Sequence, residues 1–447
     1  MVTMAGRTNS LNVWLNGTPV GTWTMRRNTS AFAYFDEWLE DENRRPLSLS
    51  MPFTAGNQPY SGDVVTNYFD NLLPDSEPIR RRLAQRFRTG STAPFELLQA
   101  IGRDCVGAVQ LLPPDVVPDD LFGIQGELLD EHGVAAILRA TTALGGLGGD
   151  DHSADLRLSI AGAQEKNALL WHEGNWYKPI GSTPTTHILK LPLGQVGNMR
   201  ADMRTSVENE WLCAQIMAGF SLPVAQTAIL RFEDQKVLGV GRFDRKYADD
   251  NSWIVRLPQE DMCQAMGLSP LSKYQTDGGP GIDRIMQLLL GSEAPEIDRR
   301  NFFKAQIIFW LLVAPDGHAK NFSIMIEPQG RYRATPLYDV LSAHPILGHG
   351  AKLISPQDVK LAMAVRGSTN YYLVNRIMRR HWSATARRVG LGATAAEQVI
   401  EEVLTQAPGI AERLRNGLPE GYPIDVADSI LEGMLQQCER LAQMPVG

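Results

Sequence analysis

The sequence predicts an α+β fold in which β-rich segments come first and a mainly helical region follows. Apolar residues alternate with polar ones at residues 11–24, 156–171 and 187–191, as they do in half-buried strands. From about Ile282 to the C-terminus, apolar residues recur mainly at helical spacing. A chain of 447 residues is also too long for one ordinary core, so we expect two or three domains.

The N-terminal region predicts a β-hairpin followed by helices. Asn16-Gly17 is a type I′ turn signal between the alternating runs 11–15 and 20–24. A helical pattern follows at 67–73, and Pro78 then opens a helix with a strongly basic composition. Its arginines are Arg80, Arg81, Arg82, Arg86 and Arg88.

A glycine-rich stretch predicts the joint between two domains. Four glycines and two acidic residues within 144–151 bury nothing and favour a flexible linker. We therefore predict an N-terminal domain at 1–143 and a second domain at 152–447. Within the second domain, the change of pattern separates a strand-rich lobe at 152–245 from a helical lobe at 246–447.

Composition excludes several classes of protein. The formal net charge of −7 gives no overall attraction to nucleic acid, so any DNA contact would have to be local. The chain has no run of 18 apolar residues and no signal-peptide core, and its four cysteines lack metal-ligand spacing. We expect a cytoplasmic protein with free thiols.

The most informative stretch runs from Asp316 to Asn321, directly after the apolar run 307–313. Its Asp and Asn are five positions apart, a spacing also found in the catalytic loop of protein kinases. In that loop the Asp accepts the proton of the hydroxyl nucleophile, and the Asn holds Mg²⁺ on the phosphates. Asp339 follows where a second metal-binding carboxylate is expected. Asp and Asn are also ordinary turn residues, so the spacing alone leaves a plain loop open.

Other parts of a phosphoryl-transfer site precede this loop. The small residues of the turn 159–166 let backbone N–H groups approach a phosphate, although a plain hairpin turn explains them as well. Lys190 lies mid-strand between two leucines, where an unpaired ammonium is disfavoured, and is a candidate cation for the α/β-phosphates. Glu210, or its competitor Glu208 on another helical face, would orient this lysine.

The order of these parts predicts a two-lobed arrangement. The segment 241–243 ends a strand at the proposed lobe boundary, where a nucleotide base would bond to backbone and pack on Phe243; a strand-end charge cluster is the alternative. His318 would contact a phosphate or cap the loop. We therefore predict a small β-rich N-terminal domain followed by a bilobal protein-kinase-like domain with a mainly helical C-terminal lobe.

These motifs resemble those of the HipA toxin kinases, which belong to type II toxin–antitoxin systems. The resemblance extends from the first hairpin to about Ala362, and more thinly to the end of the chain. The segments that carry it are Arg45–Ser50, Asn71–Ser76, Ser159–Lys166, Thr185–Lys190, Arg256–Asp261, Asp316–Asn321 and Leu337–Asp339.

The resemblance implies an ATP- and Mg²⁺-dependent serine/threonine protein kinase. Asp316 would accept the proton and Lys190 would contact the phosphates, while Asn321 and Asp339 would hold Mg²⁺. Ser159 would be an autophosphorylated serine whose modification inactivates the enzyme, because the added charge repels ATP. The residues implied to line the nucleotide are Ala161, Gly162, Ala163, Gln164, Glu165, Lys166, Lys190, Gly241, Arg242, Phe243, His318, Ala319, Lys320, Asn321, Tyr338 and Asp339.

The resemblance also implies partners. A small HipB-like helix-turn-helix antitoxin would neutralise the protein and co-repress the operon with it on operator DNA. The protein substrate would resemble glutamyl-tRNA synthetase, whose inhibition arrests growth and gives persistence. Gly241 stands where close relatives can carry a glutamate, and Pro315 removes a backbone donor before Asp316, but neither change removes a group that the chemistry requires.

A basic stretch near Trp382 is the best local candidate for DNA contact. Arg380, Arg387 and Arg388 would face the phosphate backbone, with a solvated basic helix as the alternative. Two other functional hypotheses remain open: a non-catalytic corepressor or scaffold for an antitoxin–DNA complex, and a small-molecule kinase with the same lobe design.

Overall fold

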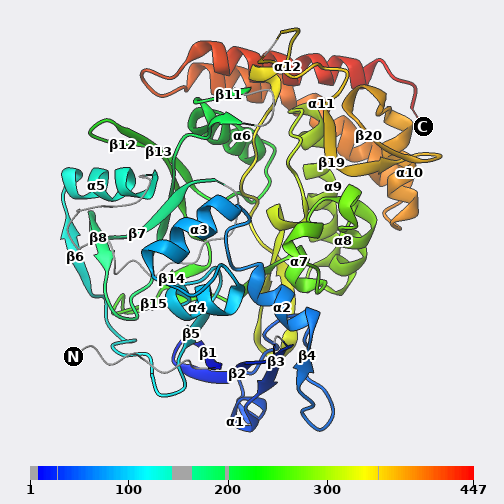
Figure 1. Cartoon of the computed structure of the whole chain (residues 1–447). Coiled ribbons are helices and arrows are strands. Elements are labelled where there is room, and N and C mark those ends of the chain that lie inside the picture. The colour runs from blue at the N-terminus through cyan, green and yellow to red at the C-terminus, as the bar shows by residue number, and fades with distance from the viewer. Residues whose placement is uncertain (1–8, 28, 143–163, 197–200, 351, 447) are drawn as a thin grey trace.

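The structure, a computed structural model, describes residues 9–27, 29–142, 164–196, 201–350 and 352–446 (Figure 1). Its three parts are an N-terminal domain, a β-rich small lobe and a mainly helical large lobe. None of the described helices is both long and apolar enough to span a membrane.

The N-terminal domain is an antiparallel sheet with helices packed on one face. The sheet order is β4-β3-β2-β1-β5, and Trp23 of β2 stacks on Phe69 of α2 with ring centroids 3.9 Å apart. Asn16 and Gly17 have φ of 46° and 85°, which confirms the predicted hairpin turn between β1 and β2. Its elements are β1 (Ser10–Leu15), β2 (Thr18–Arg26), β3 (Thr29–Tyr34), α1 (Asp36–Glu40), β4 (Tyr60–Ser61), α2 (Asp63–Asp70), α3 (Glu77–Arg86), α4 (Pro94–Ile101) and β5 (Val109–Leu112).

The small lobe is built on an antiparallel sheet in the order β12-β13-β9-β7-β8-β6. Helix α5 packs against this sheet through Val134, Ala135 and Leu138, and α6 packs on β12 and β13. Its elements are β6 (Gly126–Leu129), α5 (Glu131–Thr142), β7 (Lys166–His172), β8 (Asn175–Pro179), β9 (His187–Lys190), β10 (Gly194–Val196), β11 (Ala201–Met203), α6 (Ser206–Gly219), β12 (Thr227–Phe232), β13 (Gln235–Gly241), β14 (Arg245–Tyr247) and β15 (Ile254–Arg256).

The prediction that the N-terminal domain extends to residue 143 is wrong. β6 pairs with β8, and α5 shares a core with β7 and β9, so residues 126–142 belong to the small lobe. The glycine-rich stretch suggested the joint, but no periodicity in the sequence shows which sheet a short strand joins. The change of domain instead falls in residues 113–125, which contain no helix or strand. The predicted linker 144–151 lies outside the described residues.

The large lobe is mainly helical, as predicted, and α9 lies at its centre. Residues 302–311 of this helix are all buried, and α11 and α12 pack against it. Strands between residues 323 and 373 interrupt the helical pattern and were not expected. Its elements are β16 (Gln259–Asp261), α7 (Met262–Ala265), α8 (Ile282–Leu288), α9 (Pro295–Leu311), β17 (Ser323–Ile326), β18 (Tyr332–Ala334), β19 (Lys360–Arg366), β20 (Asn370–Leu373), α10 (Arg379–Arg388), α11 (Ala393–Asn416) and α12 (Ile424–Ala442).

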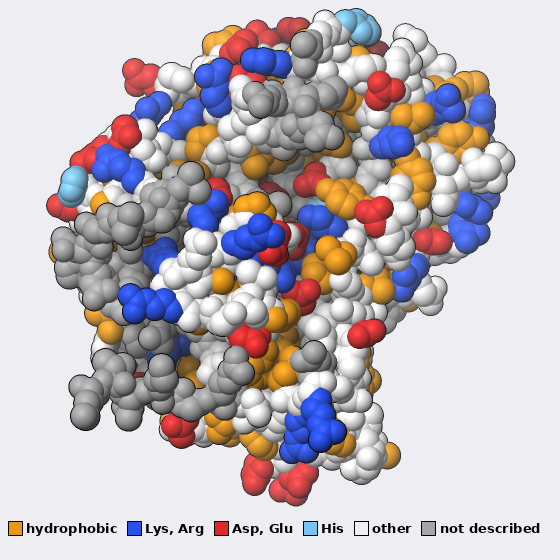
Figure 2. All heavy atoms as spheres, viewed as in Figure 1, with side chains coloured by type: hydrophobic (Ala, Val, Ile, Leu, Met, Phe, Trp, Pro, Cys, Tyr) orange, Lys and Arg blue, Asp and Glu red, His pale blue; other side chains and the backbone are white. Residues whose placement is uncertain are grey.

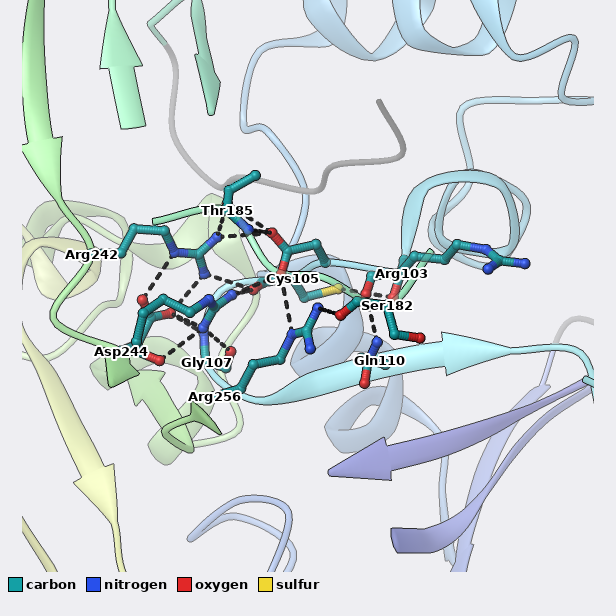
Figure 3. Close-up of polar contacts among 12 residues, drawn as sticks. Arg103, Cys105, Gly107, Gln110, Ser182, Thr185, Arg242, Asp244 and Arg256 are labelled. Atoms are coloured by element: carbon teal, nitrogen blue, oxygen red, sulfur yellow. Dashed lines mark hydrogen bonds and ion pairs between the residues drawn. The ribbon is translucent and has the colours of Figure 1, made fainter. Parts of the chain in front are cut away.

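A buried charged cluster joins the N-terminal domain to the segment that follows β13 (Figure 3). We call it the hinge cluster: Asp104, Arg242, Asp244, Arg245 and Arg256. Arg242 Nη2 lies 2.7 Å from Asp244 Oδ2, and its Nη1 lies 3.3 Å from Asp104 Oδ2. Arg245 and Arg256 contact the other oxygen of Asp104 at 2.8 and 3.2 Å. The cluster therefore fastens three separate segments of the chain together.

Electrostatics keep Asp104 ionised despite its burial. Burial acts to raise the pKa of this carboxyl, but the guanidinium groups of Arg245, Arg242 and Arg256 outweigh burial and hold the pKa below its ordinary value. The N–H of Gly107 donates to Asp244 Oδ2 at 2.7 Å, and a Cβ at Gly107 would lie 2.7 Å from the Gln259 carbonyl. A side chain at Gly107 would therefore clash with the backbone of β16 in the large lobe.

A second interface joins the N-terminal domain to the large lobe. The N–H of Leu49 donates to the buried Glu260 Oε1 at 2.9 Å, and the Ser50 hydroxyl donates to the Gln264 carbonyl at 2.8 Å. Burial raises the pKa of Glu260 to about 8. The N-terminal domain thus contacts both lobes rather than extending from one of them.

Asp104→Asn should lower the free energy of unfolding by about 3–5 kcal/mol at pH 7, because it leaves buried guanidinium groups without their shared anion. The folded-state pKa of Asp104 is depressed, so the wild-type advantage should shrink as the pH falls below about 4. Urea unfolding at pH 7 and at pH 3.5 measures both effects. Asp115→Asn, at an exposed loop position, is the control, and equal stability of the two variants would contradict the assignment.

Candidate active site

Three elements place charged side chains around Lys190 at the end of β9. Lys190 Nζ donates to Glu210 Oε1 of α6 at 2.5 Å and to Asp339 Oδ1 at 2.7 Å. Asp339 follows β18 in the large lobe, so the lysine connects the two lobes. Glu208 instead pairs with Lys236, which resolves the choice between the two glutamates in favour of Glu210.

A second lysine lies directly opposite the first. Lys166 on β7 pairs with Lys190 on β9 in the antiparallel ladder, an arrangement that like charges normally disfavour. Burial and the nearby Lys190 ammonium together lower the pKa of Lys166 to about 8, against the opposing pull of Asp339 and Glu210. Two adjacent ammonium groups are suited to an anionic ligand such as a polyphosphate.

The pKa values of the two acids around Lys190 are shifted in opposite directions. Burial acts to raise the pKa of Asp339, but Lys190 and Lys166 outweigh it and hold the pKa below its ordinary value. Burial outweighs the opposing Lys190 ammonium at Glu210 and raises the pKa of this carboxyl to about 6. Asp339 therefore stays ionised to a lower pH than Glu210 does.

Asn321 joins Asp339 through the loop that follows α9. Asn321 Nδ2 donates to Asp339 Oδ2 at 3.0 Å, and the N–H of His318 donates to Asn321 Oδ1 at 3.2 Å. Asp339 has φ of 62°, a left-handed value that costs a non-glycine residue energy and is often found at functional sites. A Cβ at Gly317 would lie 2.5 Å from the Phe309 ring, so glycine lets the loop pack on α9.

Asp316 lies at the more exposed side of the same loop. Its side chain is 54% exposed, and the Tyr274 hydroxyl donates to its Oδ1. His318 Nε2 lies 3.8 Å from the same oxygen, and the Tyr274 and His318 rings meet edge to face with centroids 5.0 Å apart. Burial lowers the pKa of His318, so it is a neutral neighbour at pH 7.

The structure does not bring every predicted residue to this site. The Arg242 side chain lies in the hinge cluster, and its N–H donates to the Thr186 carbonyl at 2.8 Å. The Lys320 ammonium turns to the N-terminal domain and contacts Asn71 and Asp75. The family resemblance places both residues at the nucleotide together with their neighbours in sequence. Their charged side chains instead contact residues of the hinge cluster and of the N-terminal domain.

The remaining predicted residues that the structure describes make contacts within their own lobes or with the N-terminal domain. The Phe243 and Tyr338 rings lie 5.7 Å apart. Gln164 Nε2 donates to the Leu191 carbonyl at 2.6 Å, and Glu165 pairs with Arg82 of α3. The N–H of Gly241 donates to the Gln226 carbonyl at 2.8 Å, and Ala319 begins a short 3-10 turn that ends at Asn321. Ser159, Ala161, Gly162 and Ala163 lie outside the described residues.

The oxygen donors present fit a magnesium ion. Asp339 supplies a carboxylate oxygen, which Mg²⁺ prefers. Asn321 contacts this carboxylate through its Nδ2, and a turn of its side chain away from the His318 N–H would present the amide oxygen to the ion. Within the described residues, no three His, Cys, Asp or Glu side chains gather as a metal site. Mg²⁺ commonly takes one or two protein ligands together with water and substrate phosphates, so this small donor set suits an ion shared with a nucleotide.

Sequence reasoning missed Tyr274 and the role of Asp75. Tyr274 precedes a glycine-rich turn and carries no spacing that relates it to Asp316. Asp75 belongs to a motif that supported the family resemblance, but only the folded chain shows that its carboxylate contacts Lys320.

The fold and the site together define a bilobal, kinase-type protein with an additional N-terminal domain. Residues 158–410 match the HipA-like C-terminal domain, and residues 11–112 match the HipA N-terminal domain. The chain is 35% identical over 417 residues to the putative kinase Y4mE of Sinorhizobium fredii, covering 92% of this chain and 93% of the relative. It therefore belongs to the HipA family.

More distant relatives agree in fold. The chain is 24% identical over 351 residues to the serine/threonine-protein kinase toxin HipA of Shewanella oneidensis, covering 75% of this chain and 76% of that protein. A solved structure of the Shewanella oneidensis MR-1 HipA with HipB and its operator DNA superposes with a TM-score of 0.77 at 23% identity, covering 97% of this chain and 98% of that chain. The arrangement of lobes and N-terminal domain is thus that of the HipA fold.

Lys190→Met should lower the free energy of unfolding by about 2–3 kcal/mol at pH 7.5, because the buried Glu210 and the half-buried Asp339 lose their shared cation while Lys166 remains nearby. The loss should be smaller at pH 5, where Glu210, with a pKa of about 6, takes up a proton. Denaturant unfolding at both pH values tests this, with the exposed Lys246→Met as control. A loss that does not change with pH would contradict the proposed coupling.

Proposed function

We propose that the chain is an ATP- and Mg²⁺-dependent serine/threonine protein kinase and the toxin of a toxin–antitoxin module. The observation that carries this proposal is the Lys190 ammonium held between Glu210 and Asp339, with Asn321 bonded to Asp339. These groups match the parts that a protein kinase uses to bind a nucleotide with its metal. The names of the HipA relatives support the same activity.

Each side chain has a distinct task in phosphoryl transfer. Lys190 and Lys166 attract the phosphates, and Asp316 orients the acceptor hydroxyl and takes its proton. The acceptor oxygen forms a bond to the γ-phosphorus as the bond from that phosphorus to ADP breaks. Asn321 and Asp339 would hold Mg²⁺, which neutralises charge on the phosphate oxygens. Catalysis in this site is mainly positioning and electrostatic stabilisation.

Asp316→Asn should fold and bind ATP as the wild type does but lose phosphoryl transfer by at least about 10²-fold, because the amide cannot accept the hydroxyl proton. Labelled ATP with a cell lysate, together with calorimetric ATP binding, measures both properties. The matched control is Asp277→Asn, an exposed aspartate close in sequence to Tyr274. Undiminished autophosphorylation in the Asp316 variant would refute the assignment.

The partners follow from the family. We infer that a HipB-like helix-turn-helix antitoxin neutralises the protein and that both bind operator DNA, as the solved Shewanella oneidensis complex contains HipA, HipB and operator DNA. We propose glutamyl-tRNA synthetase as the protein substrate and Ser159 as a site of inactivating autophosphorylation. Identification of the bands labelled in the lysate tests the substrate, and Ser159→Ala tests the inactivation.

A basic surface on α10 favours operator binding as a second function that does not need catalysis. Arg380, Arg387 and Arg388 are exposed, whereas Arg379 is buried against Glu397 and anchors the helix to α11. Figure 2 shows lysine and arginine side chains on the right of this face, where Figure 1 places α10. Repression assays with the Asp316→Asn variant separate the two functions, since a scaffold persists without chemistry.

Replacing both Arg387 and Arg388 by alanine should flatten the dependence of complex–operator affinity on salt concentration by about one to two counterions. Fluorescence anisotropy from about 50 to 200 mM salt gives the slope. Arg413 and Arg415 are exposed on α11, and their double alanine variant removes the same charge elsewhere. If both double variants keep the wild-type slope, α10 does not contact the DNA backbone.

A further inference from the structure

The ammonium of Lys320, in the predicted catalytic loop, contacts residues of the N-terminal domain. This ammonium donates to the Asn71 carbonyl at 3.1 Å and to Asn71 Oδ1 at 3.0 Å. It also lies 3.0 Å from Asp75 Oδ1 and 3.8 Å from Asp261 Oδ2. Lys320 is the residue directly before Asn321, so a group of the N-terminal domain is one residue away from a proposed metal ligand.

Asp75 holds a second segment of the same site. Its other oxygen lies 2.8 Å from Lys273 Nζ, and Lys273 directly precedes Tyr274, whose hydroxyl donates to Asp316. The Lys273 carbonyl in turn accepts the N–H of Ala319 at 3.1 Å. One carboxylate therefore fixes the loop at Lys320 and fixes the neighbouring segment that contacts the catalytic aspartate.

The segment that carries Asp75 is itself fixed before it meets the loop. Asn71 Nδ2 donates to the carbonyls of Asn67 and Leu268, both at 2.8 Å. Arg80 of α3 donates to the Pro74 carbonyl at 2.6 Å and pairs with Asp70 at 2.6 Å. Burial acts to raise the pKa of Asp75, but Lys320 and Lys273 outweigh it and lower the pKa to about 2, so the carboxylate is charged at pH 7.

We propose that Asp75 is a positioning residue for the catalytic loop, through which the N-terminal domain sets the geometry of phosphoryl transfer. This inference rests on the proposed kinase function. Docking of the domain has other supports, including the contacts of Glu260 and Gln264 and the hinge cluster, so loss of the Asp75 charge leaves the domain attached. Asp75 acts through Lys320 and Lys273 on residues that meet the substrate, and it touches no reacting atom.

The test is Asp75→Asn, which keeps the size of the side chain but removes its charge. We expect ATP affinity within about twofold of wild type and kcat reduced about tenfold or more, because the nucleotide groups around Lys190 are untouched while the loop loses its brace. The matched control is Asp63→Asn, which removes an exposed carboxylate from α2 of the same domain. It should keep wild-type kcat.

Two further variants distinguish positioning from a purely structural role. Asp75→Glu restores the charge and should recover part of kcat. In Asp75→Asn/Lys320→Met, kcat should be no lower than in Lys320→Met alone, if Asp75 acts mainly through Lys320. ATP affinity and kcat that fall together with the folded fraction, or kcat equal to wild type in Asp75→Asn, would overturn the proposal. A wild-type chain that binds ATP but phosphorylates nothing overturns the proposed function and this inference with it.

Discussion

The candidate site depends on one buried ammonium. Lys190 lies between the carboxylate of Glu210 in the small lobe and that of Asp339 in the large lobe. Glu210 is buried, and a buried carboxylate without a cation is strongly destabilising. Three elements of unrelated sequence, β9, α6 and the segment after β18, are held in register by this contact. A buried ion triad is poor at stabilising a fold, because desolvation offsets most of its attraction. Its presence is better explained by a ligand whose charge it organises.

The pair of facing lysines supports the same explanation. A sheet that served only to bury apolar surface would not place Lys166 and Lys190 opposite each other. The carboxylates of Asp339 and Glu210 compensate their charge, so the site has cations and anions close together, as a phosphate–metal complex requires. The HipA family membership and this local chemistry both support the proposed nucleotide site.

The sequence predicted which residues form the candidate site better than it predicted which groups their side chains contact. Spacing identified Lys190, Asp316, Asn321 and Asp339, because phosphoryl transfer restricts the residue types it can use. It left Glu208 and Glu210 open, since both lie on α6 and only packing shows which one meets the lysine. The family resemblance assigned Arg242 and Lys320 to the nucleotide, and the sequence could not show that their side chains contact remote segments instead, because such contacts leave no periodic pattern. The prediction of the domain boundary failed for the same reason, because β6 pairs with β8, a strand that lies far away in the sequence.

The attachment of the N-terminal domain to both lobes has a consequence for motion. Protein kinases generally admit nucleotide and release product by swinging one lobe relative to the other about the connecting segment. Here the N-terminal domain contacts that connecting segment through the hinge cluster, and it contacts the large lobe through Leu49 and Asn71. A rotation of one lobe relative to the other would therefore have to break the contacts of the N-terminal domain with one of these two regions.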